Sequence, residues 1–170
     1  MTIQLQFVRQ KGIASSAIAW FSQGNFSHVD AVLPSGRLLG ARNDNALGIP
    51  SGVQIRPEGY ADWALRVRFT IPTTQEQANK FYTFLREQIG KPYDRSAIWG
   101  FVTGRNWRAQ DSWICSELQA AALEHAGIVP PLYLSANKIT PTALALLASS
   151  IASSRQVFEG AAEFKAGFAT

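Results

Sequence analysis

The chain has 170 residues, a formal net charge of +4, 46% hydrophobic residues and 16% charged residues. These values are typical of one globular domain with a real core, so we expect a single domain over residues 1–170. The basic residues are scattered rather than gathered in a stripe, which argues against a nucleic-acid partner, and no apolar run reaches the length of a membrane span.

The small numbers of cysteine and histidine residues argue against a disulfide and against a zinc site. One cysteine excludes an intramolecular disulfide, and one cysteine with two histidines argues against a zinc site of the Cys/His type. We therefore expect no metal and no cofactor. The apolar stretch at 13–21 is short and serine-rich and no small-residue cleavage site follows it, so we expect no secretory signal and a cytoplasmic location.

Alternation of apolar and polar residues predicts a sheet in the first half of the chain. The predicted strands are residues 3–7, 27–33, 36–42, 53–56 and 64–69. The turn signal Pro34-Ser35-Gly36 joins the second and third strands into a hairpin. Residues 43–51, rich in Asn, Asp, Gly and Pro, form a loop long enough to border a cleft. We therefore expect an antiparallel meander of about five strands.

Helical spacing of apolar residues replaces this alternation in other parts of the chain. The predicted helices are residues 12–21, 73–89, 96–101, 115–126 and 140–147. Thr73 and Glu76 form a capping-box pattern at the second helix, and Gly90 ends that helix. Thr140 and Pro141 supply the N-cap and the first-turn proline of the last helix.

The tail at 150–170 has a weak pattern, in which residues 155–159 read as an edge strand. A sheet meander followed by helices indicates an α+β fold, in which the sheet packs against the helices.

Cys115 lies in the first turn of a predicted helix that starts within residues 111–119 and ends at the glycine at 127. Exposed N–H groups and the positive end of the dipole at a helix start favour a thiolate, which is the nucleophilic form of cysteine. A lone cysteine is also a common small core residue, so both roles are open for Cys115 by itself.

A nucleophilic cysteine needs a base, and the chain offers two histidines. His125 lies ten residues along the same predicted helix, roughly 15 Å from Cys115, which is too far to take its proton. His28 opens the predicted strand that ends at Pro34, so it is the candidate base.

A histidine on a strand and a cysteine at a helix start form the arrangement of papain-like enzymes, here with His28 before Cys115 in the chain. With the strings Ser-His-Val at 27–29, Gly-Lys-Pro-Tyr-Asp at 90–94 and Cys-Ser-Glu-Leu at 115–118, this order resembles the circularly permuted NlpC-like papain-fold proteins. That family includes bacterial and phage-encoded cysteine peptidases and lecithin retinol acyltransferase-like enzymes. The resemblance covers about residues 10 to 130 and implies a permuted papain-like fold.

The resemblance implies that Cys115 is the nucleophile and His28 the base. Tyr93 would lie near the cleft, where it either positions the substrate and its carbonyl or serves as an aromatic wedge beneath a turn. The backbone N–H of Cys115 would stabilise an oxyanion.

The third residue of the family's site is where this sequence departs from the pattern. Family members usually carry a polar side chain twelve positions after the histidine, and that position is Gly40 here. Three nearby side chains could orient the imidazole instead. They are Asp44 and Asn43, at the end of the next strand, and Asp30, on the same strand face as His28.

The function that the resemblance implies is that of a thiol-dependent hydrolase or acyltransferase, acting on an amide or ester of a peptide or lipid-like substrate. The glycine at position 40 leaves an alternative open, in which a catalytically inactive papain-like fold, such as a phage structural module, keeps only a binding cleft. Because that family includes phage-encoded proteins, the resemblance also allows a location in a phage particle.

Overall fold

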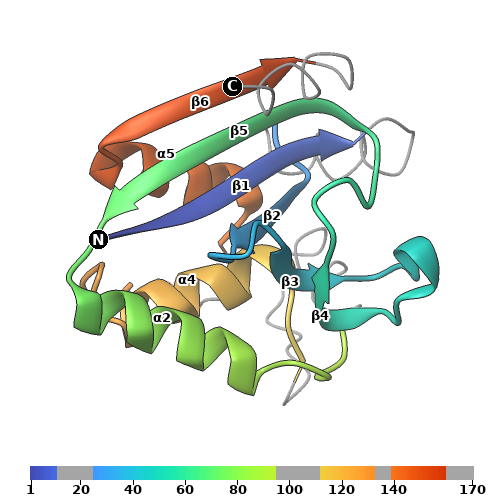
Figure 1. The fold of residues 1–170 in the computed structure, drawn as a ribbon, viewed down its shortest axis with the longest axis horizontal. Helices are drawn as coiled ribbons and strands as arrows, with labels where there is room; N and C mark the ends of the chain where they lie inside the picture. The colour runs from blue at the N-terminus through green and yellow to red at the C-terminus, as the bar shows by residue number, and fades with distance from the viewer. Residues whose placement is uncertain (11–24, 95–111, 133–138, 160–170) are drawn as a thin grey trace.

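The computed structural model describes residues 1–10, 25–94, 112–132 and 139–159, which form an α+β fold (Figure 1). Its six-stranded antiparallel sheet has the order β4-β3-β2-β1-β5-β6. The strands are β1 (Thr2–Gln10), β2 (His28–Val32), β3 (Leu38–Arg42), β4 (Gly52–Arg56), β5 (Trp63–Pro72) and β6 (Ser154–Glu159). The helices are α2 (Gln75–Glu87), α4 (Cys115–His125) and α5 (Pro141–Ile151), with a 3-10 turn, η1, at Ala46–Gly48.

The expected five-strand meander is correct only from β1 to β4. The chain then crosses back, so that β5 pairs with β1 in a register that runs from Thr2 opposite Pro72 to Leu5 opposite Phe69 and beyond. This return buries Phe69 against the same core as Leu5, which a fifth strand beside β4 would not do. The predicted edge strand at 155–159 is confirmed as β6, which pairs with β5 and makes six strands in total.

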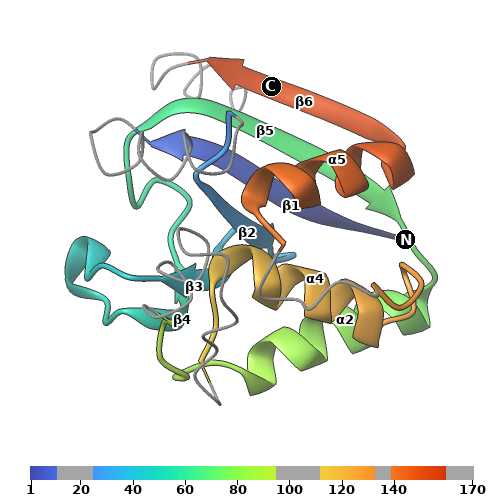
Figure 2. The ribbon, with the colours of Figure 1, turned by 180° about the vertical axis from the view of Figure 1, so that it is seen from behind.

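Helices α4 and α5 lie over one face of the sheet, and α2 lies beside α4 (Figure 2). Helix α4 packs against β2 and β3, α5 packs against β5 and β1, and α2 packs against α4. The main core lies between these layers and includes Val29 and Ala31 of β2. Because side chains alternate along a strand, His28 and Asp30 are on the other side of β2 from these core residues.

Helix α2 begins one residue later than the sequence pattern predicts. Its N-cap is Thr74, whose side chain accepts a hydrogen bond from the Gln77 amide while the Gln77 side chain bonds back to the Thr74 amide. The predicted capping box of Thr73 and Glu76 is therefore wrong. The reason is that the Thr73 N–H donates to the Met1 carbonyl at 2.9 Å, which extends the pairing of β5 with β1 by one residue.

Some of the other predicted helices lie within the described residues, and some lie outside them. Helix α5 begins at Pro141 and Thr140 caps it, as predicted. The predicted helices at 12–21 and 96–101 lie outside the described residues, as does the tail after 159. Within the described ranges, no helix has the length and apolar character needed to cross a membrane.

Candidate active site

Cys115 is the first residue of α4, in agreement with its predicted place in the first turn of a helix. The N-cap residue, Ile114, has extended dihedral angles (φ −94°, ψ 160°) and makes no side-chain capping bond, so no side chain of the cap competes for the first-turn amides. The Cys115 side chain is 5% exposed and belongs to the main core. The helix start thus supplies the N–H groups and the dipole end that favour a thiolate, in a largely buried setting.

Two buried side chains of α4 fix the helix to its surroundings. Gln119 donates from Nε2 to the Leu39 carbonyl of β3 at 3.0 Å. Ser116 donates from Oγ to the Ile139 carbonyl at 2.5 Å. Because Gln119 lies one turn after Cys115, its bond to β3 sets the position of the cysteine relative to the β2-β3 hairpin.

Backbone pairing connects β4 to the turn that precedes Tyr93. The Gly90 N–H donates to the Val53 carbonyl at 2.9 Å, and the Val53 N–H donates to the Lys91 carbonyl at 2.9 Å. Gly52 makes this approach possible, since a β-carbon at that position would lie 2.4 Å from the Lys91 carbonyl oxygen. The edge of the sheet therefore continues, beyond β4, into the Gly90–Lys91 turn.

The same pairing continues from that turn to the segment that enters α4. The Trp113 N–H donates to the Pro92 carbonyl at 3.1 Å, and the Asp94 N–H donates to the Trp113 carbonyl at 3.0 Å, so that Tyr93 and Trp113 form a parallel bridge. Burial, and next the charge of Cys115, raise the pKa of Tyr93 above its ordinary value of 10.0. Tyr93 is therefore a half-buried neutral phenol, and its backbone bridges to Trp113, two residues before Cys115.

His28 is the first residue of β2 and is 6% exposed. Its Nε2 donates to Asp30 Oδ1 at 2.9 Å. Burial alone would lower the pKa of His28, but the charges of Asp30 and Cys115, and hydrogen bonds with both, raise it from 6.5 to about 9. The imidazole therefore interacts with a carboxylate and with the single thiol, and this environment favours its protonated form.

Among the three substitutes that the sequence offered for a third residue, Asp30 is the one that contacts His28. Burial would raise the pKa of Asp30, but the charge and hydrogen bond of His28, together with a hydrogen bond from Tyr60, hold it below 3.8. Asp44 instead pairs with Arg42, to which it is joined by Nε at 2.7 Å and also by Nη2. Asn43 is exposed.

Sequence reasoning missed two residues of the site, Tyr60 and Arg42. The Tyr60 hydroxyl donates to Asp30 Oδ2 at 2.8 Å, and Arg42 Nη1 donates to the Tyr60 oxygen at 3.1 Å. Tyr60 lies in the connection between β4 and β5, and Arg42 is the last residue of β3. Arg42 was predicted only as the last residue of the strand at 36–42, and Tyr60 follows no periodic pattern. No local signal in the sequence shows that the fold brings these two side chains together.

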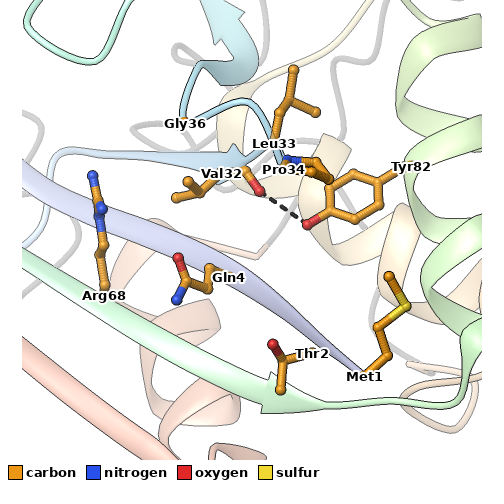
Figure 3. Close-up of a pocket in the computed structure, with 9 residues that line it drawn as sticks. All are labelled: Met1, Thr2, Gln4, Val32, Leu33, Pro34, Gly36, Arg68 and Tyr82. Carbon is orange, nitrogen blue, oxygen red and sulfur yellow. Dashed lines mark hydrogen bonds between the residues drawn. The ribbon is translucent and has the colours of Figure 1, made fainter.

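A groove elsewhere on the molecule contains none of these residues (Figure 3). It has a volume of about 530 Å³ and lies where β1, the β2-β3 turn and α2 meet. Its lining residues are Met1, Thr2, Gln4, Val32, Leu33, Pro34, Gly36, Arg68 and Tyr82. The Tyr82 hydroxyl donates to the Val32 carbonyl at 2.9 Å across one end of this groove (Figure 3).

Metal ligands are not clustered in the part of the chain that the structure describes. No group of three or more His, Cys, Asp or Glu side chains there could hold a metal ion. The side chains of the candidate site are Cys115, His28, Asp30, Tyr60, Arg42 and Tyr93.

Comparison with known proteins finds similarity to solved structures alone. No family model matches the sequence, and no curated protein matches it. The fold is similar to that of the metalloprotein yiiX from Escherichia coli O157:H7, a DUF1105 protein, with a TM-score of 0.53 and 20% sequence identity. The match covers 76% of this chain and 67% of that one. At this identity the similarity shows a shared fold and nothing about activity.

Proposed function

We propose that this protein is a thiol-dependent hydrolase of the circularly permuted papain type, in which Cys115 is the nucleophile, His28 the base and Asp30 the residue that orients His28. The observation that supports the proposal is the environment of His28, which is buried, bonds to Asp30 Oδ1 at 2.9 Å and has its pKa raised by both Asp30 and Cys115. A thiol, an imidazole and an orienting carboxylate are the parts that nucleophilic catalysis by cysteine requires.

The proposed reaction begins with transfer of the Cys115 proton to His28. The sulfur then attacks the carbonyl carbon of an amide or ester, and the negative charge that develops on the carbonyl oxygen is stabilised by the Cys115 N–H. Protonated His28 gives its proton to the leaving amine or alcohol as the carbon–heteroatom bond breaks, leaving a thioester on Cys115. Water, deprotonated by His28, attacks the thioester, and the acid leaves as the thiol is restored.

The electrostatics of His28 support this sequence of proton transfers. Burial would lower the pKa of His28, but Asp30 and Cys115 raise it to about 9. The imidazole can therefore hold a proton near neutral pH, as a base that takes the proton of a thiol must do. An imidazole that could not keep the proton would leave the sulfur protonated and weakly nucleophilic.

The family that the sequence resembles would allow two classes of substrate, peptides of the cell wall and lipid esters, and an acceptor other than water would make the enzyme an acyltransferase. The structural neighbour is called a metalloprotein. Assays of this chain therefore compare activity with and without a chelator, and activity that survives chelation supports the thiol route.

The first test is the rate of thiol alkylation by iodoacetamide between pH 5 and 9, in the wild type and in His28→Ala. His125→Ala is the matched control, because His125 stacks on Phe84 with ring centroids 5.0 Å apart, at the far end of α4. We expect the pH of half-maximal rate to rise in His28→Ala and to stay unchanged in His125→Ala. The same pH of half-maximal alkylation in the wild type and in His28→Ala would refute the proposed Cys115–His28 pair.

The second test looks for the acyl-enzyme. The protein is mixed with a panel of activated esters and peptide amides, and intact-mass spectrometry detects the added acyl group. We expect acylation in the wild type, none in Cys115→Ala, and slow acylation in Asp30→Asn.

The burial of Cys115 favours a second candidate, a non-catalytic binding module of the same fold. Its thiol is 5% exposed and its side chain belongs to the hydrophobic core, as expected for a structural cysteine. This candidate predicts slow alkylation at every pH, no acyl-enzyme, and unchanged behaviour of Cys115→Ala in binding assays.

A further inference from the structure

The carboxylate of Asp30 is held from two directions. Oδ1 accepts a hydrogen bond from His28 at 2.9 Å, and Oδ2 accepts one from the Tyr60 hydroxyl at 2.8 Å. The two donors come from different parts of the fold, since His28 begins β2 while Tyr60 precedes β5. Asp30 is 2% exposed, so water has little room to replace either donor.

Tyr60 is itself fixed in position. Its side chain is 4% exposed, and its ring meets Trp63 edge to face with centroids 5.1 Å apart. Arg42 lies over the Tyr60 ring at 4.8 Å from the centroid and also donates to the phenol oxygen. Asp44 holds the other side of the Arg42 guanidinium. A rigid phenol of this kind can fix the rotamer of the carboxylate that it binds.

Asp30 needs such support because of its place on the strand. It is two residues from His28 on β2, so its reach to the imidazole depends on its own χ angles. On the neighbouring strand Gly40 contributes no side chain. Burial and the nearby Asp30 charge raise the pKa of Tyr60 well above 10.0, so Tyr60 remains a hydrogen-bond donor at all ordinary pH values.

We propose that Tyr60 is a positioning residue of the candidate active site, which holds the Asp30 carboxylate against His28 and thereby favours the thiolate of Cys115. This inference rests on the proposed function of Cys115 and His28. The charged and titratable groups around Asp30 are His28, Tyr60, Arg42 and Arg56.

The test is Tyr60→Phe, with Tyr82→Phe as the matched control. Both changes remove one buried hydroxyl that donates a hydrogen bond, but the acceptor of Tyr82 is the Val32 carbonyl in the groove of Figure 3. We expect Tyr60→Phe to raise the pH of half-maximal alkylation of Cys115 and to slow alkylation at pH 7 by about three- to tenfold, which corresponds to half a pH unit to one unit. Tyr82→Phe should leave the profile unchanged.

The direction in which the alkylation midpoint shifts in Tyr60→Phe distinguishes two roles of Tyr60. The hydroxyl either positions Asp30 for His28 or competes with His28 for the Asp30 charge. If Tyr60 merely drew charge from Asp30, removing its hydroxyl would strengthen the Asp30–His28 bond and move the alkylation midpoint to lower pH. A lower or unchanged midpoint in Tyr60→Phe would therefore overturn the proposal, while the comparison of the wild type with His28→Ala tests the proposed function separately.

A double-mutant cycle shows whether Tyr60 acts through Asp30. In Asp30→Asn, the added change Tyr60→Phe should have less than half of its effect in the wild type, and a full effect would contradict the mechanism. Circular dichroism reports whether each variant is folded. If Tyr60→Phe were not folded, Arg42→Lys would be measured instead, because it removes the guanidinium donor that orients the phenol, and an unchanged profile there would overturn the proposal.

Discussion

Gly40 and Asp30 share one space between β2 and β3. A β-carbon at position 40 would lie 2.0 Å from Asp30 Oδ1 and 3.1 Å from its Cγ. The carboxylate thus occupies the volume into which a side chain at position 40 would project, on the side of the sheet where it bonds to His28. The Asp30 carboxylate in its present rotamer therefore requires a glycine at position 40, where the family that the sequence resembles carries a polar side chain.

Gly40→Ala should disturb the site strongly. The added methyl group cannot coexist with Asp30 in its present rotamer, so either the carboxylate rotates away from His28 or the hairpin opens. We expect alkylation of Cys115 at pH 7 to slow by about tenfold. Gly59→Ala is the control, because nothing lies within 4 Å of a β-carbon there. Equal rates in the two variants would show that Asp30 does not need the space at Gly40.

An exchange of residues tests the same relationship in the other direction. Asp30→Ala and Gly40→Asp should each impair alkylation and acylation, the first by removing the carboxylate and the second by placing two carboxylates in one space. The double variant Asp30→Ala/Gly40→Asp keeps one carboxylate near His28, and we expect it to recover much of the rate lost in each single variant. Rates in the double variant at or below those of both single variants would contradict this account.

The raised pKa of His28 makes stability depend on pH. Because the pKa is about 9 in the folded protein against 6.5 ordinarily, protonated His28 stabilises the fold. That contribution is fully present below pH 6.5 and is lost as the pH rises through 9, and a shift of this size corresponds to at most about 3 kcal/mol. Urea unfolding of Cys115→Ala at pH 6, 7.5 and 9 measures the part of this decline that Asp30 causes, because the variant lacks both the titration of the thiol and the contribution of Cys115 to the pKa of His28.

The control for this measurement is Asp30→Asn in the same Cys115→Ala background. The Asp30 charge is the largest of the causes that raise the pKa of His28, so its removal should flatten the decline in unfolding free energy between pH 6.5 and 9. A decline of the same size with and without the Asp30 charge would mean that another group titrates in this window.

The two residues with sharp local signals were the ones that the sequence could predict. Cys115 stands before a run of strong helix formers and His28 opens an alternating strand, and both predictions are confirmed as element starts. Asp30 was one of three candidates, because period-2 alternation places it on the face of His28 but says nothing about Tyr60, which reaches it across 30 residues.

The remaining differences between sequence and structure arise from long-range pairing. The capping box moved by one residue because Thr73 bonds to Met1, and the meander ended at β4 because β5 pairs with β1. Neither relationship is local, so no window of the sequence contains it. The permuted papain-like architecture and the roles of the site residues are still predictions, and the alkylation and acylation experiments test those roles.

Gly52→Ala tests whether the pairing between β4 and the Gly90–Lys91 turn positions the site. Gly52 has a φ of +106°, and a β-carbon there would lie 2.4 Å from the Lys91 carbonyl, whereas Gly48 has a φ of +72° with nothing within 4 Å. Gly48→Ala should therefore cost only the backbone strain, about 1 kcal/mol of unfolding free energy. Gly52→Ala should cost at least about 1 kcal/mol more. Because the same turn leads to Tyr93 and the bridge before Cys115, Gly52→Ala should also change the alkylation profile, and Gly48→Ala should not. If the two variants differed in stability but alkylated identically, the turn would support the fold without positioning the cysteine.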